Sequence, residues 1–203
     1  MSKWSPNDKK LNMPGGTAGK LIKLKSRQKA LSMWGDFRTL YEPYYGHGEI
    51  YEAIYKGLPF TGHVANEIEE DVASASGAIH TDCLDYIQKT DIAALDISVA
   101  DFDAYGVPLE QVAAFLRKQA TDCLLMMTVG NVCFRMRPNV RREKFYYGDT
   151  SGKKFKLDWK HNVDLPKQYV LDACDDLGFR VEKQLMAGYH GHVNYFFFFL
   201  RKE

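Results

Sequence analysis

Residues 123–129 (CLLMMTV) form a run of apolar residues that is bounded on both sides by polar ones. Such a run without polar alternation is typical of a strand buried on both faces of a parallel sheet. Other short apolar runs alternate along the chain with segments whose apolar residues have helical spacing. Because parallel strands need crossover connections, this alternation predicts an α/β fold with helices on both faces of the sheet.

The expected elements follow one another in a simple order. We expect strands at residues 38–44, 61–68, 78–80, 92–99, 123–129, 180–186 and 193–200, and helices at residues 21–34, 50–55, 69–75, 83–87, 109–120 and 166–177. Residues 1–19 are polar and contain Pro and Gly, which indicates a loop or an arm. The connection between the last two strands is too short for a parallel crossover, so they should pair antiparallel. The sequence therefore predicts a doubly wound, mostly parallel sheet that ends in an antiparallel hairpin.

The length of 203 residues fits one compact domain. We expect residues 1–35 to form a basic N-terminal arm and helix, and residues 36–203 to form a single domain with a basic insertion at about residues 130–164. No apolar stretch reaches the ~18 residues of a membrane span, and the Lys-rich N-terminus lacks the apolar core of a secretory signal. Four scattered cysteines favour free thiols, and no metal site is expected. These features predict a cytoplasmic protein, and a chain this small is compatible with a viral or mobile-element origin.

The charges are segregated along the chain, although the formal net charge is only +1. Residues 1–30 carry eight Lys and Arg against one acid, and residues 135–160 carry nine against three, so the remainder is acidic. Two basic segments on an acidic body indicate contact with a polyanion, or else they are solvated faces.

Acidic residues and glycines stand where the first three strands should end. The first strand leads into Glu42, Tyr44, Gly46 and Gly48, the second ends at Glu67, and the third ends before Asp82. Ligands of open parallel sheets bind at the carboxyl ends of the strands. Glycines there let the backbone approach a ligand, an acid about twenty residues on can accept ribose hydroxyl protons, and Asp82 is positioned to meet an adenine amino group.

In this order the motifs resemble those of class I S-adenosylmethionine-dependent methyltransferases. LYEPYYGHGEIYEAI is similar to the first motif of the family, VANEIEEDV to the second and GAIHTDCLDYI to the third, and the likeness covers roughly residues 38–200. It implies a Rossmann-like sheet of seven strands and S-adenosylmethionine as the cofactor. By this resemblance Glu42, Gly46 and Gly48 would line the methionine end, Glu67 would bind ribose and Asp82 adenine. Tyr44 stands where the family usually has its first glycine, and nucleic-acid methyltransferases often have a larger residue there.

The segment ADFDAYGVP (residues 100–108) brings two carboxylates and an aromatic ring to the end of the fourth strand. The lone pair of an exocyclic base nitrogen is delocalised into its ring, so it is a poor nucleophile. A carboxylate that accepts its N–H bonds would localise that lone pair and stabilise developing positive charge, and an adjacent ring can stack on the base. Asp103 and Tyr105 have these capacities. The alternative is an acidic loop in which Tyr105 packs on the following helix.

DFDAYGVP also resembles the acidic-x-Asp-Pro-Tyr/Phe-Gly-x-Pro motif of tRNA guanine-N2 methyltransferases, and more distantly the Asp-Pro-Pro-Tyr motif of amino-methyltransferases acting on DNA and RNA. The likeness implies that Asp103 holds the target amino group, that Tyr105 stacks on the base and that Asp101 supports them. Ala104 replaces the proline of the motif, which affects the rigidity of this turn.

The basic segment after the fifth strand should leave from the same edge of the sheet as the cleft. Its cations alternate with aromatic residues, so that cations can neutralise phosphates while rings stack on bases. The candidate nucleic-acid-binding residues are Arg135, Arg137, Arg141, Arg142, Lys144, Lys153, Lys154 and Lys156. N-terminal cations, among them Lys20, Lys23, Lys25, Arg27 and Lys29, could extend this surface. The nearby MPGGTAGKL departs from a phosphate loop and could be a loop over the methionine end of the cofactor.

These features favour a methyltransferase acting on an exocyclic amino nitrogen of a base in DNA or RNA, with nucleic acid as a partner and no membrane contact. An inactive methyltransferase-like binding protein and a small-molecule methyltransferase remain the alternatives.

Overall fold

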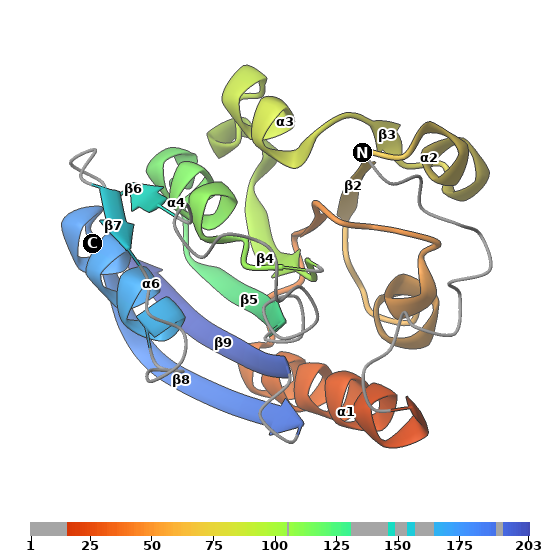
Figure 1. The fold of residues 1–203 in the computed structure, drawn as a ribbon, viewed down its shortest axis with the longest axis horizontal. Helices are drawn as coiled ribbons and strands as arrows, with labels where there is room; N and C mark the ends of the chain where they lie inside the picture. The colour runs from red at the N-terminus through yellow and green to blue at the C-terminus, as the bar shows by residue number, and fades with distance from the viewer. Residues whose placement is uncertain (1–15, 105, 131–145, 149–153, 157–164, 190–192) are drawn as a thin grey trace.

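The computed structural model describes residues 16–104, 106–130, 146–148, 154–156, 165–189 and 193–203 (Figure 1). Its main feature is a seven-stranded sheet with the order β3-β2-β1-β4-β5-β9-β8. The strands are β1 (Thr39–Glu42), β2 (Gly62–Glu67), β3 (Ile79–His80), β4 (Ile97–Phe102), β5 (Cys123–Gly130), β8 (Phe179–Tyr189) and β9 (Val193–Lys202). A separate antiparallel pair consists of β6 (Tyr146–Gly148) and β7 (Lys154–Lys156).

The first five strands of the large sheet are parallel, and β9 inserts between β5 and β8 with antiparallel pairing on both sides. The pairing of β5 with β9 runs from Cys123 opposite Leu200 to Gly130 opposite Val193. The predicted α/β sheet with a terminal antiparallel hairpin is therefore confirmed.

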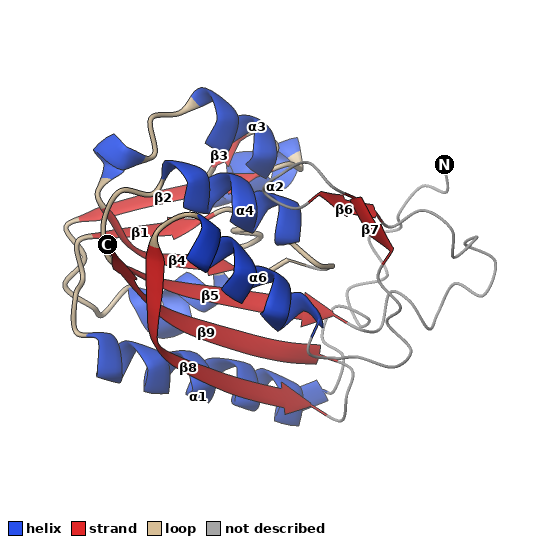
Figure 2. Ribbon diagram, turned by 90° about the vertical axis from the view of Figure 1, so that its left-hand side faces the viewer, coloured by secondary structure: helices blue, strands red, loops and turns tan. Residues whose placement is uncertain are grey.

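Two layers of helices cover the sheet (Figure 2). One face carries α3, α4 and α6, and the other carries α1 and the π-helical segment η2. The helices are α1 (Gly16–Trp34), η2 (Tyr51–Tyr55), α2 (Glu70–Ser76), α3 (Cys83–Lys89), α4 (Leu109–Lys118) and α6 (Leu165–Asp176). None of these described helices has both the length and the apolar character to cross a membrane.

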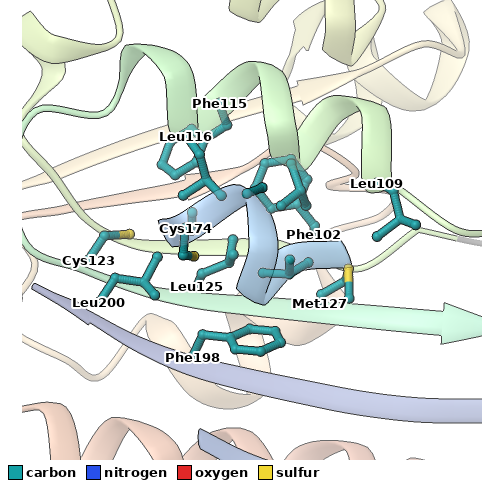
Figure 3. Close-up of a cluster of buried hydrophobic side chains, with 14 of the residues drawn as sticks. Phe102, Leu109, Phe115, Leu116, Cys123, Leu125, Met127, Cys174, Phe198 and Leu200 are labelled. Carbon is teal, nitrogen blue, oxygen red and sulfur yellow. The ribbon is translucent and has the colours of Figure 1, made fainter. Parts of the chain in front are cut away.

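The apolar run of β5 is explained by these two layers. Leu124 and Met126 are buried in the core beneath α1, whereas Leu125 and Met127 belong to the core beneath α4 and α6. Figure 3 shows the second of these cores, in which Leu116 of α4 and Cys174 of α6 lie on the same side of the sheet as Leu125 of β5. Because successive side chains of a strand point to opposite faces, a strand between two cores needs apolar residues at every position.

The structure differs from the sequence-based expectation at the strand predicted for residues 92–99. Residues Ala93–Leu95 form a short 3-10 helix, Asp96 has a left-handed backbone with φ +50°, and β4 begins at Ile97. Ile92 is fully buried, so its apolar character reflects packing of this turn against the core. An apolar run alone does not distinguish such a turn from a strand.

The expected loop at residues 1–19 is wrong for its last four residues, because α1 already begins at Gly16. Helix propensity is a weak prior, and glycine costs only about 1 kcal/mol in a helix. Gly19 is buried, so tertiary packing offsets that cost. Residues 1–15 lie outside the described part of the chain.

Candidate active site

The turn that follows β1 has the backbone that the glycines predict. Gly46 and Gly48 have φ values of +55° and +71°, in the left-handed region that favours glycine. A Cβ on Gly48 would lie 2.8 Å from the hydroxyl oxygen of Tyr45, whereas a Cβ on Gly46 would have no neighbour within 4 Å. The backbone at Gly46 therefore borders open space that a ligand can enter.

The end of β2 is tied to this turn by the carboxylate of Glu67. Its Oε2 accepts a hydrogen bond from the backbone N–H of Gly46 at 2.8 Å, and its Oε1 accepts from the N–H groups of Ile68 and Glu69. Next to it, the buried Asn66 amide donates to the carbonyl of Pro43 at 3.2 Å. The first two strand ends are thus brought together, as the sequence predicts.

Asp82 follows β3 and caps the N-terminus of α3. Its Oδ1 accepts from the backbone N–H groups of Leu84 and Asp85 at 2.8 and 3.1 Å. The N–H of Thr81 donates to the carbonyl of Glu67 at 2.9 Å, which places the third strand end beside the second. The capping bonds stabilise the helix without any ligand, and the contact of Asp82 with adenine stays a prediction.

Tyr44, which replaces a glycine of the family motif, packs against the core shared with α3 and α4. Burial and the neighbouring Cys83 thiol raise the pKa of its hydroxyl. The ring therefore occupies core space, which explains how this turn accommodates a large side chain.

Glu42 at the end of β1 is 5% exposed, and one oxygen, Oε2, lies 2.8 Å from Nε2 of His63. Burial raises the pKa of Glu42 to about 7, because the contact with His63 only partly offsets the loss of solvation and Asp101 adds repulsion. The His63 ring stacks on Tyr51 with a centroid distance of 4.4 Å. No sequence pattern points to His63, because its closeness to Glu42 depends on the register between β1 and β2.

Asp101, in β4, is held by an arginine of α1. Arg27 Nε donates to Asp101 Oδ2 at 2.7 Å, Arg27 Nη2 donates to Oδ1 at 2.8 Å, and both side chains are 1% exposed. The hydroxyl of Tyr55 also donates to Oδ2, at 2.6 Å. Both oxygens of Asp101 are therefore engaged inside the protein, and this residue can support the site without touching an acceptor.

Asp103 lies just beyond the end of β4, with a side chain that is 17% exposed. Its Oδ1 accepts from the hydroxyl of Thr128 at 2.6 Å and from Arg27 Nη2 at 3.1 Å, and its Oδ2 accepts from Nζ of Lys23. Burial opposes ionisation, but Lys23 and Arg27 outweigh it, so the pKa of Asp103 lies below its usual value. The site therefore holds an ionised carboxylate in a fixed orientation.

The cations that hold these acids lie on one face of α1. Lys20, Lys23 and Arg27 are three and four residues apart, and Lys20 pairs with Glu49 at 3.2 Å.

The idea that Arg27 extends a nucleic-acid surface is wrong, because its guanidinium is buried. The alternative of a loop at residues 13–21 over the methionine end of the cofactor is wrong for residues 16–21, which are helical in α1, and residues 13–15 lie outside the described part of the chain. The spacing of these cations in the sequence indicates that they share one face of a helix, but it does not indicate their acidic partners, which are distant in the sequence.

Tyr105 and six of the predicted nucleic-acid-binding residues lie outside the described part of the chain: Arg135, Arg137, Arg141, Arg142, Lys144 and Lys153. Lys154 and Lys156 belong to β7, which pairs with β6 near α4 (Figure 2). Their role stays a prediction.

Comparison with solved structures relates this geometry to known folds. No family model matches the sequence, and a search of curated proteins gives no match. The N-methyltransferase NodS from Bradyrhizobium japonicum has a TM-score of 0.58 at 9% identity, covering 94% of this chain and 100% of its own. Trm1 from Pyrococcus horikoshii, solved with S-adenosyl-L-methionine, has a TM-score of 0.60 at 12% identity, and the match covers 94% of this chain and 58% of Trm1. Geranyl diphosphate methyltransferase, also solved with that cofactor, has a TM-score of 0.55 at 10% identity, and the match covers 95% of this chain and 94% of that enzyme.

The chain therefore has the class I fold of S-adenosylmethionine-dependent methyltransferases. The matching structures include enzymes with different acceptors, so the likeness defines the fold and leaves the acceptor to the residues of the site.

Proposed function

We propose that the protein is an S-adenosylmethionine-dependent methyltransferase that modifies an exocyclic amino nitrogen of a base in DNA or RNA. The observation that carries this proposal is the ionised, oriented carboxylate of Asp103 at the carboxyl end of β4, near the glycine turn of a methyltransferase fold.

The residues at the first three strand ends fit the cofactor. Open space beside Gly46 admits a ligand close to the backbone, and Glu67 is a hydrogen-bond acceptor for ribose hydroxyls. Asp82 uses Oδ1 for helix capping, which leaves Oδ2 for the adenine amino group. When bound, the cofactor supplies a methyl group on a sulfonium, and transfer forms a nitrogen–carbon bond as the sulfur–carbon bond breaks.

Asp103 would accept the N–H bonds of the target amino group and hold its lone pair toward the methyl group. Its lowered pKa makes it a hydrogen-bond acceptor and a weak base. The proton that the nitrogen loses after methylation therefore passes to water. Arg27 and Thr128 are positioning residues for Asp103, because both donate hydrogen bonds to it. Asp101 in turn positions Arg27. We assign Tyr105 to stacking on the base.

The basic segment at residues 135–160, with nine Lys and Arg against three acids, supports a nucleic-acid acceptor over a small molecule. A small-molecule acceptor is the second candidate, because one matching structure is geranyl diphosphate methyltransferase in complex with geranyl diphosphate. An amino group on a small molecule would meet the same carboxylate.

Transfer of a radiolabelled methyl group onto DNA, tRNA, ribosomal RNA and a set of small amines tests this function directly. We expect label in one nucleic acid, on an amino nitrogen after digestion to nucleosides, and loss of that label with Asp103→Asn. Label only in a small amine would refute the nucleic-acid assignment. Absence of calorimetric heat and of any thermal shift with millimolar S-adenosylmethionine would refute the cofactor.

A further inference from the structure

The two oxygens of Asp103 have different surroundings. Oδ1 already accepts two hydrogen bonds, from Thr128 and from Arg27. Oδ2 accepts from the ammonium of Lys23, and the side chains of Asp103 and Lys23 are each 17% exposed. One oxygen is thus fixed from within the protein, and the other is covered by a cation near the surface.

The two cations also differ in how readily they can leave. Arg27 is 1% exposed, and its planar guanidinium binds two carboxylates at once. Lys23 makes its contact through a single ammonium on a flexible stem. A compact ammonium of this kind exchanges partners more easily than a buried bidentate guanidinium.

An incoming amino group must therefore replace Lys23. A carboxylate oxygen has about two lone-pair sites, and both sites of Oδ1 are used. The target N–H bonds can reach only Oδ2, where the Lys23 ammonium takes one of the two sites. A nitrogen that gains positive charge during methylation is repelled by an ammonium bound to the same oxygen. The acceptor and Lys23 compete for the same oxygen.

A displaced Lys23 ammonium needs a new anion. Lys20 lies one turn earlier on the same face of α1 and is held by Glu49, so Glu49 already has a cationic partner. A phosphate that enters together with the target base can supply the missing negative charge.

We propose that Lys23 closes the site by occupying Asp103 Oδ2 and opens it by moving to a backbone phosphate of the nucleic-acid substrate. This inference rests on the proposed function and adds a selection rule: a base on a phosphate backbone releases Asp103, whereas the same base as a free nucleoside does not.

Lys23→Met tests the rule, with Lys183→Met as a control that removes an equal charge from an exposed position on β8. In Lys23→Met we expect kcat/KM for the phosphate-free nucleoside to rise several-fold and KM for the nucleic acid to increase. Lys23→Arg should keep the preference for nucleic acid over the nucleoside, because it retains the charge, but with a lower kcat on nucleic acid, because a guanidinium leaves a carboxylate less readily than an ammonium. Lys183→Met should match the wild type on both substrates.

Binding of a fluorescent oligonucleotide at several salt concentrations gives a readout that does not depend on catalysis. Loss of one phosphate contact should reduce the slope of log affinity against log salt by about one in Lys23→Met. In Lys23→Met, an unchanged slope or an equal fall in activity on nucleoside and nucleic acid would overturn the proposed role of Lys23 but not the proposed function. A wild type that neither binds nor methylates nucleic acid would refute the proposed function, and the inference with it.

Discussion

Arg27 and Asp101 form a bidentate ion pair in the interior, with nitrogen–oxygen distances of 2.7 and 2.8 Å, and this pair joins α1 to the central strand β4. The charges of Asp101 and Asp103 outweigh the effect of burial and raise the pKa of Arg27 further above its usual value. The same guanidinium reaches Asp103, so one side chain connects the packing of α1 to the orientation of the candidate catalytic carboxylate.

Removing this guanidinium should destabilise the protein strongly. Arg27→Met leaves Asp101 buried without its cation, and breaking one side of a buried pair typically costs about 3–5 kcal/mol. Urea denaturation of this variant and the wild type measures the loss. Lys25→Met, at an exposed position of α1, should stay within about 0.5 kcal/mol of the wild type. Equal stability of Arg27→Met and Lys25→Met would contradict the buried network.

Neutralising Asp103 should separate chemistry from cofactor binding. Asp103→Asn keeps the size of the side chain but removes the charge, and we expect methyl transfer to fall by about 10²-fold or more. The calorimetric affinity for S-adenosylmethionine should stay close to that of the wild type. Thr128→Val, which removes one hydrogen bond to Asp103 and one from Arg27 but keeps the charge of Asp103, serves as the milder comparison. Parallel loss of cofactor affinity in Asp103→Asn would show that our division of roles is wrong.

Glu42 should make stability depend on pH. Its pKa rises from 4.5 to about 7 in the folded protein, so the native state binds this proton more tightly than the unfolded chain. Stability is therefore lost as pH rises from about 4.5 to about 7, and at higher pH the charged form costs about 3 kcal/mol. Glu42→Gln should be more stable than the wild type at pH 8 and nearly equal to it at pH 4, by urea denaturation. A variant that is less stable than the wild type at pH 8 would contradict the burial cost.

The two glycines of the turn should respond differently to alanine. Gly48→Ala places a Cβ against the Tyr45 hydroxyl at a left-handed φ, so we expect a loss of more than about 1 kcal/mol in unfolding free energy. Gly46→Ala has only the backbone strain, about 1 kcal/mol, but its methyl group enters the open space proposed for the cofactor. We expect a clear loss of S-adenosylmethionine affinity by calorimetry. Normal affinity in folded Gly46→Ala would place the cofactor elsewhere.

Local patterns predicted most of the sheet. The apolar run of β5 lies between two cores, and the short connection between the last two strands produces the antiparallel pairing of β8 with β9. The prediction failed where one pattern has two meanings, as at Ala93–Leu95, where apolar residues form a 3-10 turn.

The sequence by itself determined the α/β architecture and the gathering of Glu42, Glu67 and Asp103 at one edge, because parallel strands that follow crossovers end on the same side. Only the tertiary structure decided which charges meet. Arg27 lies 74 residues from Asp101 and Lys23 lies 80 residues from Asp103, and contacts over such separations depend on how α1 packs against the sheet. The cations of α1 that read as a basic surface are in part the buried counter-ions of the site, since a carboxylate inside a protein is stable only beside a positive charge.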